Sequence, residues 1–235
     1  MLSQKTTTTK FYRHAWLWFM LAMAVIVTGF FKSFFSKMAE TDLVHHFHGI
    51  TCSGWIFLLI IQPFLYSRDK MGAHRKLGKI SFILAPLLVI SGLMMMHLML
   101  SRKDGLNSLT YIISFLDVII LAHFIFFYIS AIKHRHNTQL HARYMAGTVL
   151  ALLPTGVARI VMLIPALNKG ILWLDITYIL LELTSIALII DDKRKGKIYP
   201  PYVIALLFFI VQHIGLHFVG DWPLWQKLMN AFAGL

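Results

Sequence analysis

Cysteine and charge are both scarce in this sequence. Cys52 is the only cysteine, which excludes an internal disulfide, a c-type haem attachment motif and a thiolate zinc cage. Only 22 Lys and Arg and 10 Asp and Glu are spread over 235 residues. A soluble domain covers its surface with charge, so this composition excludes an ordinary cytosolic, a disordered or a secreted disulfide-rich protein. Any metal or haem has to be held by His, carboxylate or Met side chains.

Long apolar runs occur where a soluble protein would carry charge. Hydrophobic residues make up 58% of the chain, and its mean hydropathy is +0.70. An apolar run of about 17 to 25 residues is long enough to cross roughly 30 Å of hydrocarbon. Seven such runs predict an all-α integral membrane bundle of seven transmembrane helices, forming one domain over residues 1–235. The predicted spans are 15–35, 45–66, 79–100, 109–132, 143–165, 171–190 and 201–219.

The distribution of Lys and Arg predicts the orientation of these spans. The N-terminal segment and alternate loops carry 15 of the 22, the opposite loops carry six, and Arg159 lies inside a span. Because positive loops stay in the cytoplasm, we expect the N-terminus inside and the C-terminus outside. No small-residue cleavage site follows the first span before Lys37, which predicts a retained anchor. The net charge of +12 then faces anionic lipid, so we expect no nucleic-acid partner.

Six histidines lie at the predicted outer ends of three spans. His213 and His217 are spaced i, i+4, so both imidazoles share one helix face, as ligands of one metal would. On a helix His45 and His48 also share a face, whereas His46 and His48 are roughly 200° apart. The residue at which the helix starts therefore decides whether His45 or His46 is a ligand together with His48. The alternative is that the rings bind water and lipid phosphate. The six are His45, His46, His48, His97, His213 and His217.

Four ionisable residues lie deeper in the spans. An unpaired Arg in hydrocarbon costs several kcal/mol, so we expect Arg159 to pair with Asp117, or failing that with Glu182. These three are the candidate catalytic residues, and Asp175 is a further candidate base. An ion pair that only fixes helix packing is an equally good interpretation.

A third group, on the predicted inner side, consists of His123, His141 and His74. These are candidate cofactor ligands, although His74 and His141 also lie among Lys and Arg residues of the positive loops. The chain has 12 Met, including Met94 to Met96, which would suit copper. Consecutive Met residues point to different helix faces, however, so a methionine copper site is disfavoured.

Several short motifs carry a resemblance to a known family. They are His46-Phe47-His48-Gly49, Leu59–Pro63, Ala73–Lys79, His141–Met145, Ala158–Ile160 and Asp191-Asp192. Along nearly its whole length the chain resembles bacterial membrane proteins of the domain of unknown function 2306, in the version found in Bacteroidetes-type bacteria. The resemblance implies a multi-pass protein of the bacterial inner membrane and brings no activity. It marks five motif positions, which are His46, His48, His74, His141 and Arg159.

A weaker likeness is to the seven-span ceramidase and adiponectin-receptor superfamily. Its zinc is held by a second-span His and a seventh-span HxxxH motif, which His213 and His217 would match, with His45 or His48 as the other ligand. In those receptors the zinc lies toward the side of the N-terminus. Here the predicted cluster lies on the opposite side, which indicates convergence at most.

Two classes of function follow from these patterns. The first is a membrane oxidoreductase with a quinone or lipid-like substrate and a b-type haem or a zinc, iron or copper ion. Haem would lie between His48 and His97 or His213 outside, and between His123 and His141 inside.

Within this class the rival chemistry is a zinc hydrolase. Its ligands would be His46 or His48 with His213 and His217, and its base Asp117 or Asp175. The second class is non-enzymatic: partner binding, assembly or transport, including self-association. An odd number of spans without visible self-similarity argues against an inverted-repeat transporter.

Overall fold

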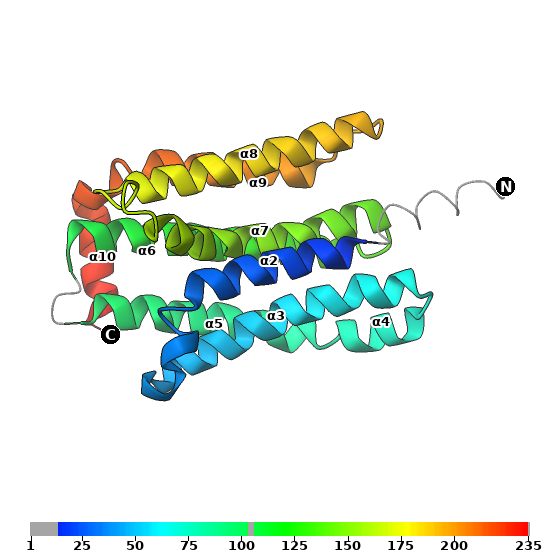
Figure 1. Ribbon diagram of the computed structural model, residues 1–235, viewed down its shortest axis with the longest axis horizontal. Coiled ribbons are helices and arrows are strands. Elements are labelled where there is room, and N and C mark those ends of the chain that lie inside the picture. Colours follow the sequence, from blue (N-terminus) through cyan, green and yellow to red (C-terminus); the bar gives the residue numbers. More distant parts are fainter. Residues whose placement is uncertain (1–13, 103–105, 235) are drawn as a thin grey trace. The chain divides into compact units, whose positions relative to one another are not determined.

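The computed structural model describes residues 14–102 and 106–234, and every regular element in these ranges is helical (Figure 1). The prediction of an all-α protein is therefore confirmed. The elements are α2 (Ala15–Phe30), η1 (Phe35–Glu40), α3 (Leu43–Ser67), α4 (Met71–Gly78), α5 (Ser81–Leu100), α6 (Ser108–Lys133), α7 (Thr138–Met162), α8 (Leu172–Arg194), α9 (Pro200–Gly215), η2 (Val219–Asp221) and α10 (Pro223–Ala233). Lys5, Lys10, Arg13 and Lys103 entered the charge count and lie outside the described residues.

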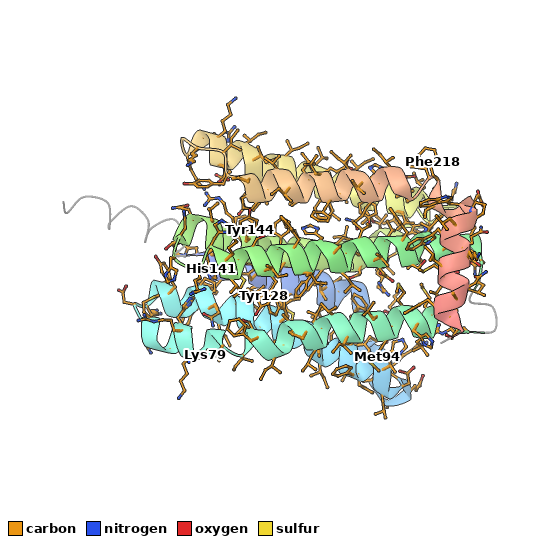
Figure 2. The ribbon with its side chains drawn as sticks, turned by 180° about the vertical axis from the view of Figure 1, so that it is seen from behind. Lys79, Met94, Tyr128, His141, Tyr144 and Phe218 are labelled. Carbon is orange, nitrogen blue, oxygen red and sulfur yellow. The ribbon has the colours of Figure 1, made fainter. Side chains whose placement is uncertain are left out.

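Five helical stretches are long and apolar enough to cross a membrane: α3, the continuous run Met71–Leu100, α6, α7 and α8. The apolar helices α2 and α9 are shorter, at 16 residues each. At 1.5 Å per residue they cover about 24 Å. Large apolar side chains are exposed along the helices, as contact with lipid requires. Among them, Ile83 is 68% and Phe218 71% exposed, and Figure 2 shows Phe218 at the surface beyond α9.

Three boundaries differ from the sequence-based expectation. The helix α2 ends at Phe30 rather than residue 35, directly after Gly29, which is a poor helix former. The helix α9 ends at Gly215, so His217 lies in the turn that follows. The basic segment expected as a loop contains α4, whose His74 Nδ1 donates to the carbonyl of Gln62 at 3.3 Å. That bond ties α4 to α3 and gives this polar helix a tertiary partner.

The chain divides into two compact units, and the boundary falls inside α5, between Ser91 and Gly92. In the first unit α2 packs on α3 and α3 on α4. Asp42 caps α3 by accepting from the His45 N–H at 3.0 Å, and the helix buries Trp55 and Ile56 completely. The His45 ring also bonds to the Asp42 carboxylate, and this bond lowers the pKa of Asp42 below its usual value.

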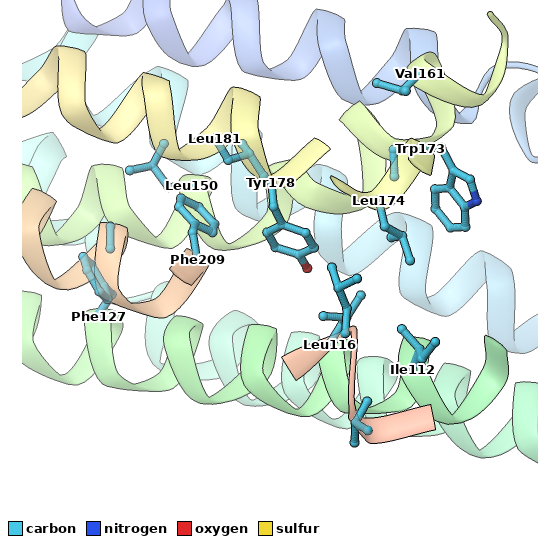
Figure 3. Close-up of a cluster of buried hydrophobic side chains, with 14 of the residues drawn as sticks. Ile112, Leu116, Phe127, Leu150, Val161, Trp173, Leu174, Tyr178, Leu181 and Phe209 are labelled. Carbon is cyan, nitrogen blue, oxygen red and sulfur yellow. The ribbon is translucent and has the colours of Figure 1, made fainter. Parts of the chain in front are cut away.

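In the second unit α6 packs on α7, and α8 packs on both α7 and α9. Their shared core includes Phe127, Tyr178 and Phe209, all fully buried or nearly so (Figure 3). The helix α10 crosses the end of α6 (Figure 1), where Trp225 Nε1 donates to the carbonyl of Tyr111 at 2.9 Å. The second unit therefore has a continuous apolar core with a transverse helix at one end.

A buried ion pair joins α7 to α8 within this unit. Arg143 Nε lies 3.0 Å from both carboxylate oxygens of Asp192, and Arg143 Nη2 donates to Oδ1 at 2.5 Å. Both side chains are almost fully buried, and the guanidinium also stacks over the ring of Tyr199, 4.0 Å from its centroid. Arg143 and Asp192 entered the sequence analysis as loop charge and as members of family motifs, and their pairing was not anticipated.

Candidate metal centre

Two packed helices of the second unit bring together four of the polar residues singled out above. Asp175 and Glu182 lie on one face of α8, because their spacing of seven residues is close to two helical turns. His213 lies in the last turn of α9, and His217 follows one turn later. Asp175 in the first turn of α8 and His213 in the last turn of α9 both suit the sign of the helix dipole. The antiparallel packing of α8 and α9 places these two ends together.

Asp175, His213 and His217 form a compact group of potential ligands. One ligand atom from each residue lies within 4.8 Å of the other two. Asp175 Oδ1 is 3.0 Å from His217 Nε2 and 3.5 Å from His213 Nε2. Asp175 and His213 are about three-quarters buried, whereas His217 is 44% exposed. The group is thus enclosed on the side of the helices and open at His217.

Glu182 contacts the far side of the His213 ring, where His213 Nδ1 lies 2.9 Å from Glu182 Oε1. In the tautomer in which Nδ1 donates to this carboxylate, Nε2 presents its lone pair toward Asp175. A carboxylate that holds the far nitrogen of a metal-binding His is the usual outer partner of such ligands.

Asp175 Oδ1 is buried and accepts no hydrogen bond. It lies 3.0 Å from His217 Nε2, which is within the distance of an ion pair, but the direction of this contact does not suit a hydrogen bond. A buried carboxylate oxygen without a donor is costly. A cation between this oxygen and the two Nε2 atoms would remove that cost.

The His213 ring is also fixed by packing. Tyr178 stacks on it, with ring centroids 6.0 Å apart and planes at 25°. The Tyr178 hydroxyl donates to Gln212 Oε1 at 3.0 Å, and Gln212 Nε2 donates to the carbonyl of Phe208 at 3.0 Å. Figure 3 shows the Tyr178 hydroxyl among apolar side chains of the core. These contacts hold His213 in one orientation.

This donor set suits a divalent transition metal better than haem. Two imidazoles and one carboxylate leave coordination positions for water or substrate, as in catalytic zinc and non-haem iron sites. His213, in the last turn of α9, and His217, in the turn that follows, lie 6.0 Å apart at their ring centroids. Axial ligands of one haem have to lie on opposite faces of the porphyrin, which two residues one turn apart do not do.

Asp117 and Arg159 lie close enough to interact electrostatically, as do Asp117 and Tyr178. Arg159 Nη1 also donates to the carbonyl of Thr155 at 2.9 Å. The pairing of Arg159 with Asp117 stays a prediction, whereas Glu182 bonds to His213. The sequence analysis missed Tyr178, although it lies three residues after Asp175 and four before Glu182, which is the helical spacing of a shared face.

The remaining predicted histidines have partners of other kinds. His46 packs against Phe34, and His48 Nδ1 lies 3.0 Å from Ser91 Oγ with Cys52 Sγ 3.5 Å from Nε2. In the second unit the His97 ring packs against Phe232. The convergence of His46, His48 and His97 with the metal cluster stays a prediction.

On the predicted inner side, His74 and His141 each use Nδ1 to bond a backbone carbonyl, that of Gln62 and Ala131 respectively. His123 is fully buried, and neither of its ring nitrogens has a hydrogen-bond partner. A shared cofactor between these three histidines stays a prediction.

The comparisons give no further guide to the site. No protein-family model, no curated protein and no solved structure matches the chain.

Proposed function

We propose that this chain is a membrane-embedded metal-dependent hydrolase with one divalent metal ion bound by Asp175, His213 and His217. Seven spans with the N-terminus in the cytoplasm place this group in the outer half of the bilayer. The same proposal includes membership in the family of unknown function 2306 and a location in the bacterial inner membrane. The short motifs and the loop charges support these two points.

The observation that carries the proposal is that three ligand atoms lie within 4.8 Å of one another. Glu182 contacts the Nδ1 atom of His213, on the side of the ring away from these atoms. A carboxylate oxygen without a hydrogen bond faces two imidazole nitrogens at 3.0 and 3.5 Å. Structural ion pairs also bring His and Asp together, but they use the hydrogen-bonding direction that Asp175 Oδ1 lacks.

The chemistry follows from the open coordination positions. Asp175, His213 and His217 would hold a divalent metal that would supply Lewis-acid chemistry and lower the pKa of a bound water, which suits hydrolysis of an ester, amide or phosphate. Asp117 would accept the proton of that water and return it to the leaving group. Because the helices around the site are apolar on the outside, the substrate would be lipid-like and enter from the bilayer.

A second candidate function uses the same ligands. Two His and one carboxylate are the set that non-haem iron enzymes use, so an iron-loaded protein would be an oxidoreductase, with a quinone or lipid-like substrate. The identity of the bound metal separates the two candidates.

The test is the metal content of purified protein after growth with zinc and iron both present. We expect close to one zinc per chain in the wild type, and loss of most of it in His213→Ala and in Asp175→Asn. His134→Ala is the matched control, because its Nδ1 bonds to the carbonyl of Ser130 at 2.8 Å and it is not one of the candidate ligands. Stoichiometric iron would replace the hydrolase by the oxidoreductase. Equal metal content in wild type and both ligand variants would refute the centre and leave the partner-binding bundle.

A further inference from the structure

His123 is the least satisfied polar side chain in the described part of the second unit. Its ring is fully buried in α6, and both Nδ1 and Nε2 lack a hydrogen-bond partner. Every neutral imidazole carries one N–H donor and one lone-pair acceptor, so two hydrogen-bonding functions are lost here. Buried polar groups are nearly always paired, and an unpaired one calls for a functional explanation.

The rings around His123 form an aromatic stack. Phe208 is nearly parallel to the imidazole, with centroids 4.6 Å apart and planes at 12°. Phe127 and Phe209 lie 4.5 and 5.6 Å away on other sides, and both are fully buried. His123 is therefore enclosed by flat apolar surfaces, and none of these three rings offers it a hydrogen bond.

One of these three rings is itself near the surface. Phe208 is only half-buried, unlike Phe127 and Phe209. Its neighbour along α9, Leu207, is 55% exposed, and Phe126, whose ring lies 6.1 Å from that of Phe208, is 42% exposed. In a bilayer these exposed side chains contact lipid. A change of the Phe208 rotamer would thus open His123 to the hydrocarbon phase and not to water.

We propose that His123 and Phe208 form a binding site for the headgroup of a lipid quinone. The Phe208 ring moves aside, and the headgroup lies beside the imidazole so that one quinone carbonyl accepts the imidazole N–H in the plane of that ring. The lone-pair nitrogen accepts from a hydroxyl of the reduced form, so both redox forms find a partner. The isoprenoid tail remains in lipid beside Leu207. The proposal concerns binding alone and does not depend on the metal centre.

The surroundings favour a quinone over other membrane-soluble ligands. A fatty acid or a phospholipid headgroup carries a charge that the three phenylalanine rings cannot neutralise. A saturated lipid or sterol tail carries no acceptor for the imidazole N–H.

The experiment measures binding to the purified full chain in lipid nanodiscs by isothermal titration. The probes are decylubiquinone and decylbenzene, which share the tail and differ in the two carbonyls. We expect saturable binding of decylubiquinone at about one site per chain, and no saturable binding of decylbenzene. His123→Phe keeps a stacking ring and removes both polar atoms, so we expect at least a tenfold loss of affinity for decylubiquinone.

Two further variants test whether the Phe208 ring has to move aside for the quinone to bind. Phe208→Ala removes the ring that covers His123, and we expect a severalfold gain in affinity. Phe126→Ala is the matched control, since it removes a neighbouring surface ring that does not stack on His123, and we expect affinity within twofold of wild type. The metal content should be unchanged in all three variants, which separates this site from the metal centre.

Several outcomes would overturn the quinone site. These are an absence of saturable quinone binding, equal binding of decylbenzene, or equal affinity in wild type and His123→Phe. If His123→Phe does not fold, the Phe208→Ala result decides, because lower or unchanged affinity there contradicts displacement of that ring.

Discussion

The two units of the chain differ in the kind of polar side chain that they bury. Up to Ser91 the buried polar residues of the described chain are neutral, namely Thr51, Gln62, Ser81 and Ser91. From Gly92 onward they include the charged pair Arg143 and Asp192 and the titratable His123. Both units are helical and apolar, so the difference lies in whether the polar side chains buried between their helices are neutral or charged.

The neutral groups of the first unit bond mainly to nearby backbone carbonyls and to one another. Thr51, Ser81 and Ser91 each donate to a carbonyl three residues earlier. Such bonds form locally and do not select a neighbour, whereas the hydroxyls of Thr51 and Ser91, 2.9 Å apart, join α3 to α5 without any charge. Neither side-chain polar atom of Gln62 has a hydrogen-bond partner. The charges of the second unit need a partner on another helix, since a lone buried charge is expensive. Buried charges therefore specify which helices of this unit pair and in what register.

The largest expected effect is the loss of the Arg143–Asp192 pair. Arg143→Ala leaves the Asp192 carboxylate buried without its cation, which should cost about 3–5 kcal/mol of stability. In the double variant Arg143→Met with Asp192→Leu, no charge remains buried, and we expect most of that loss to be recovered. Reversible unfolding in mixed micelles measures both.

The counterpart in the first unit is Ser91→Ala, for which we expect a loss of about 1 kcal/mol. Equal losses in Arg143→Ala and Ser91→Ala would remove the contrast between the units.

The second effect compares one glycine from each unit. A Cβ at Gly147 would lie 1.9 Å from Cδ1 of Phe127, whose ring is fully buried. A Cβ at Gly54 would lie 3.6 Å from the Leu84 side chain, an ordinary contact. We expect Gly147→Ala to destabilise by about 1–3 kcal/mol through overpacking between α6 and α7. Gly54→Ala should be neutral or slightly stabilising, because alanine is the better helix former.

Thermal unfolding of the two glycine variants is the measurement. A Gly147→Ala protein as stable as wild type would show that α6 and α7 are not in close contact at this point, and would weaken the case for a tightly specified second unit.

The smallest effect concerns the exposed helix cap of the first unit. The bond from the His45 ring, followed by the His45 N–H, lowers the pKa of Asp42. A lowered carboxyl pKa stabilises the fold above the pKa of the unfolded chain, and this contribution is lost as the pH falls through the folded pKa. We therefore expect hydrogen-exchange protection of the first turn of α3 to decrease in acid.

Two variants test the titration separately from the cap. Asp42→Asn keeps a capping side chain and should remove the pH dependence. Asp42→Ala should lower protection at every pH. Protection that falls equally in wild type and in Asp42→Asn would show that Asp42 is not the titrating group.

Much of the helical architecture follows from the sequence because apolar length is a local property. The predicted third span, 79–100, is close to Ser81–Leu100, and 109–132 is close to Ser108–Lys133. The short helix α4 was missed because its basic composition resembles a loop, and its contact with Gln62 is set by tertiary structure. The number of spans and their orientation stay predictions.

The candidate site was predictable only in part. The spacing of His213 and His217 predicted that their rings lie near each other, although the shared helix face was wrong because α9 ends at Gly215. The depth of Asp175 and Glu182 was also visible in the sequence. Which cation meets which carboxylate depends on how each helix is rotated about its axis, and the sequence does not define that rotation. For this reason Glu182 was considered for Arg159, while it in fact holds His213.

The arrangement of the metal ligands also constrains how the chain is made. Asp175 and Glu182 are synthesised before His213 and His217, and α8 and α9 are joined by a short turn after Arg194. At about 5–20 residues per second, the 35 residues from Glu182 to His217 take the ribosome about 2–7 s. During that interval the Asp175 and Glu182 carboxylates of α8 lack their imidazole partners. Entry of α8 and α9 into the bilayer as one hairpin avoids exposing these carboxylates to lipid, so biogenesis of this protein should depend on the α8–α9 turn.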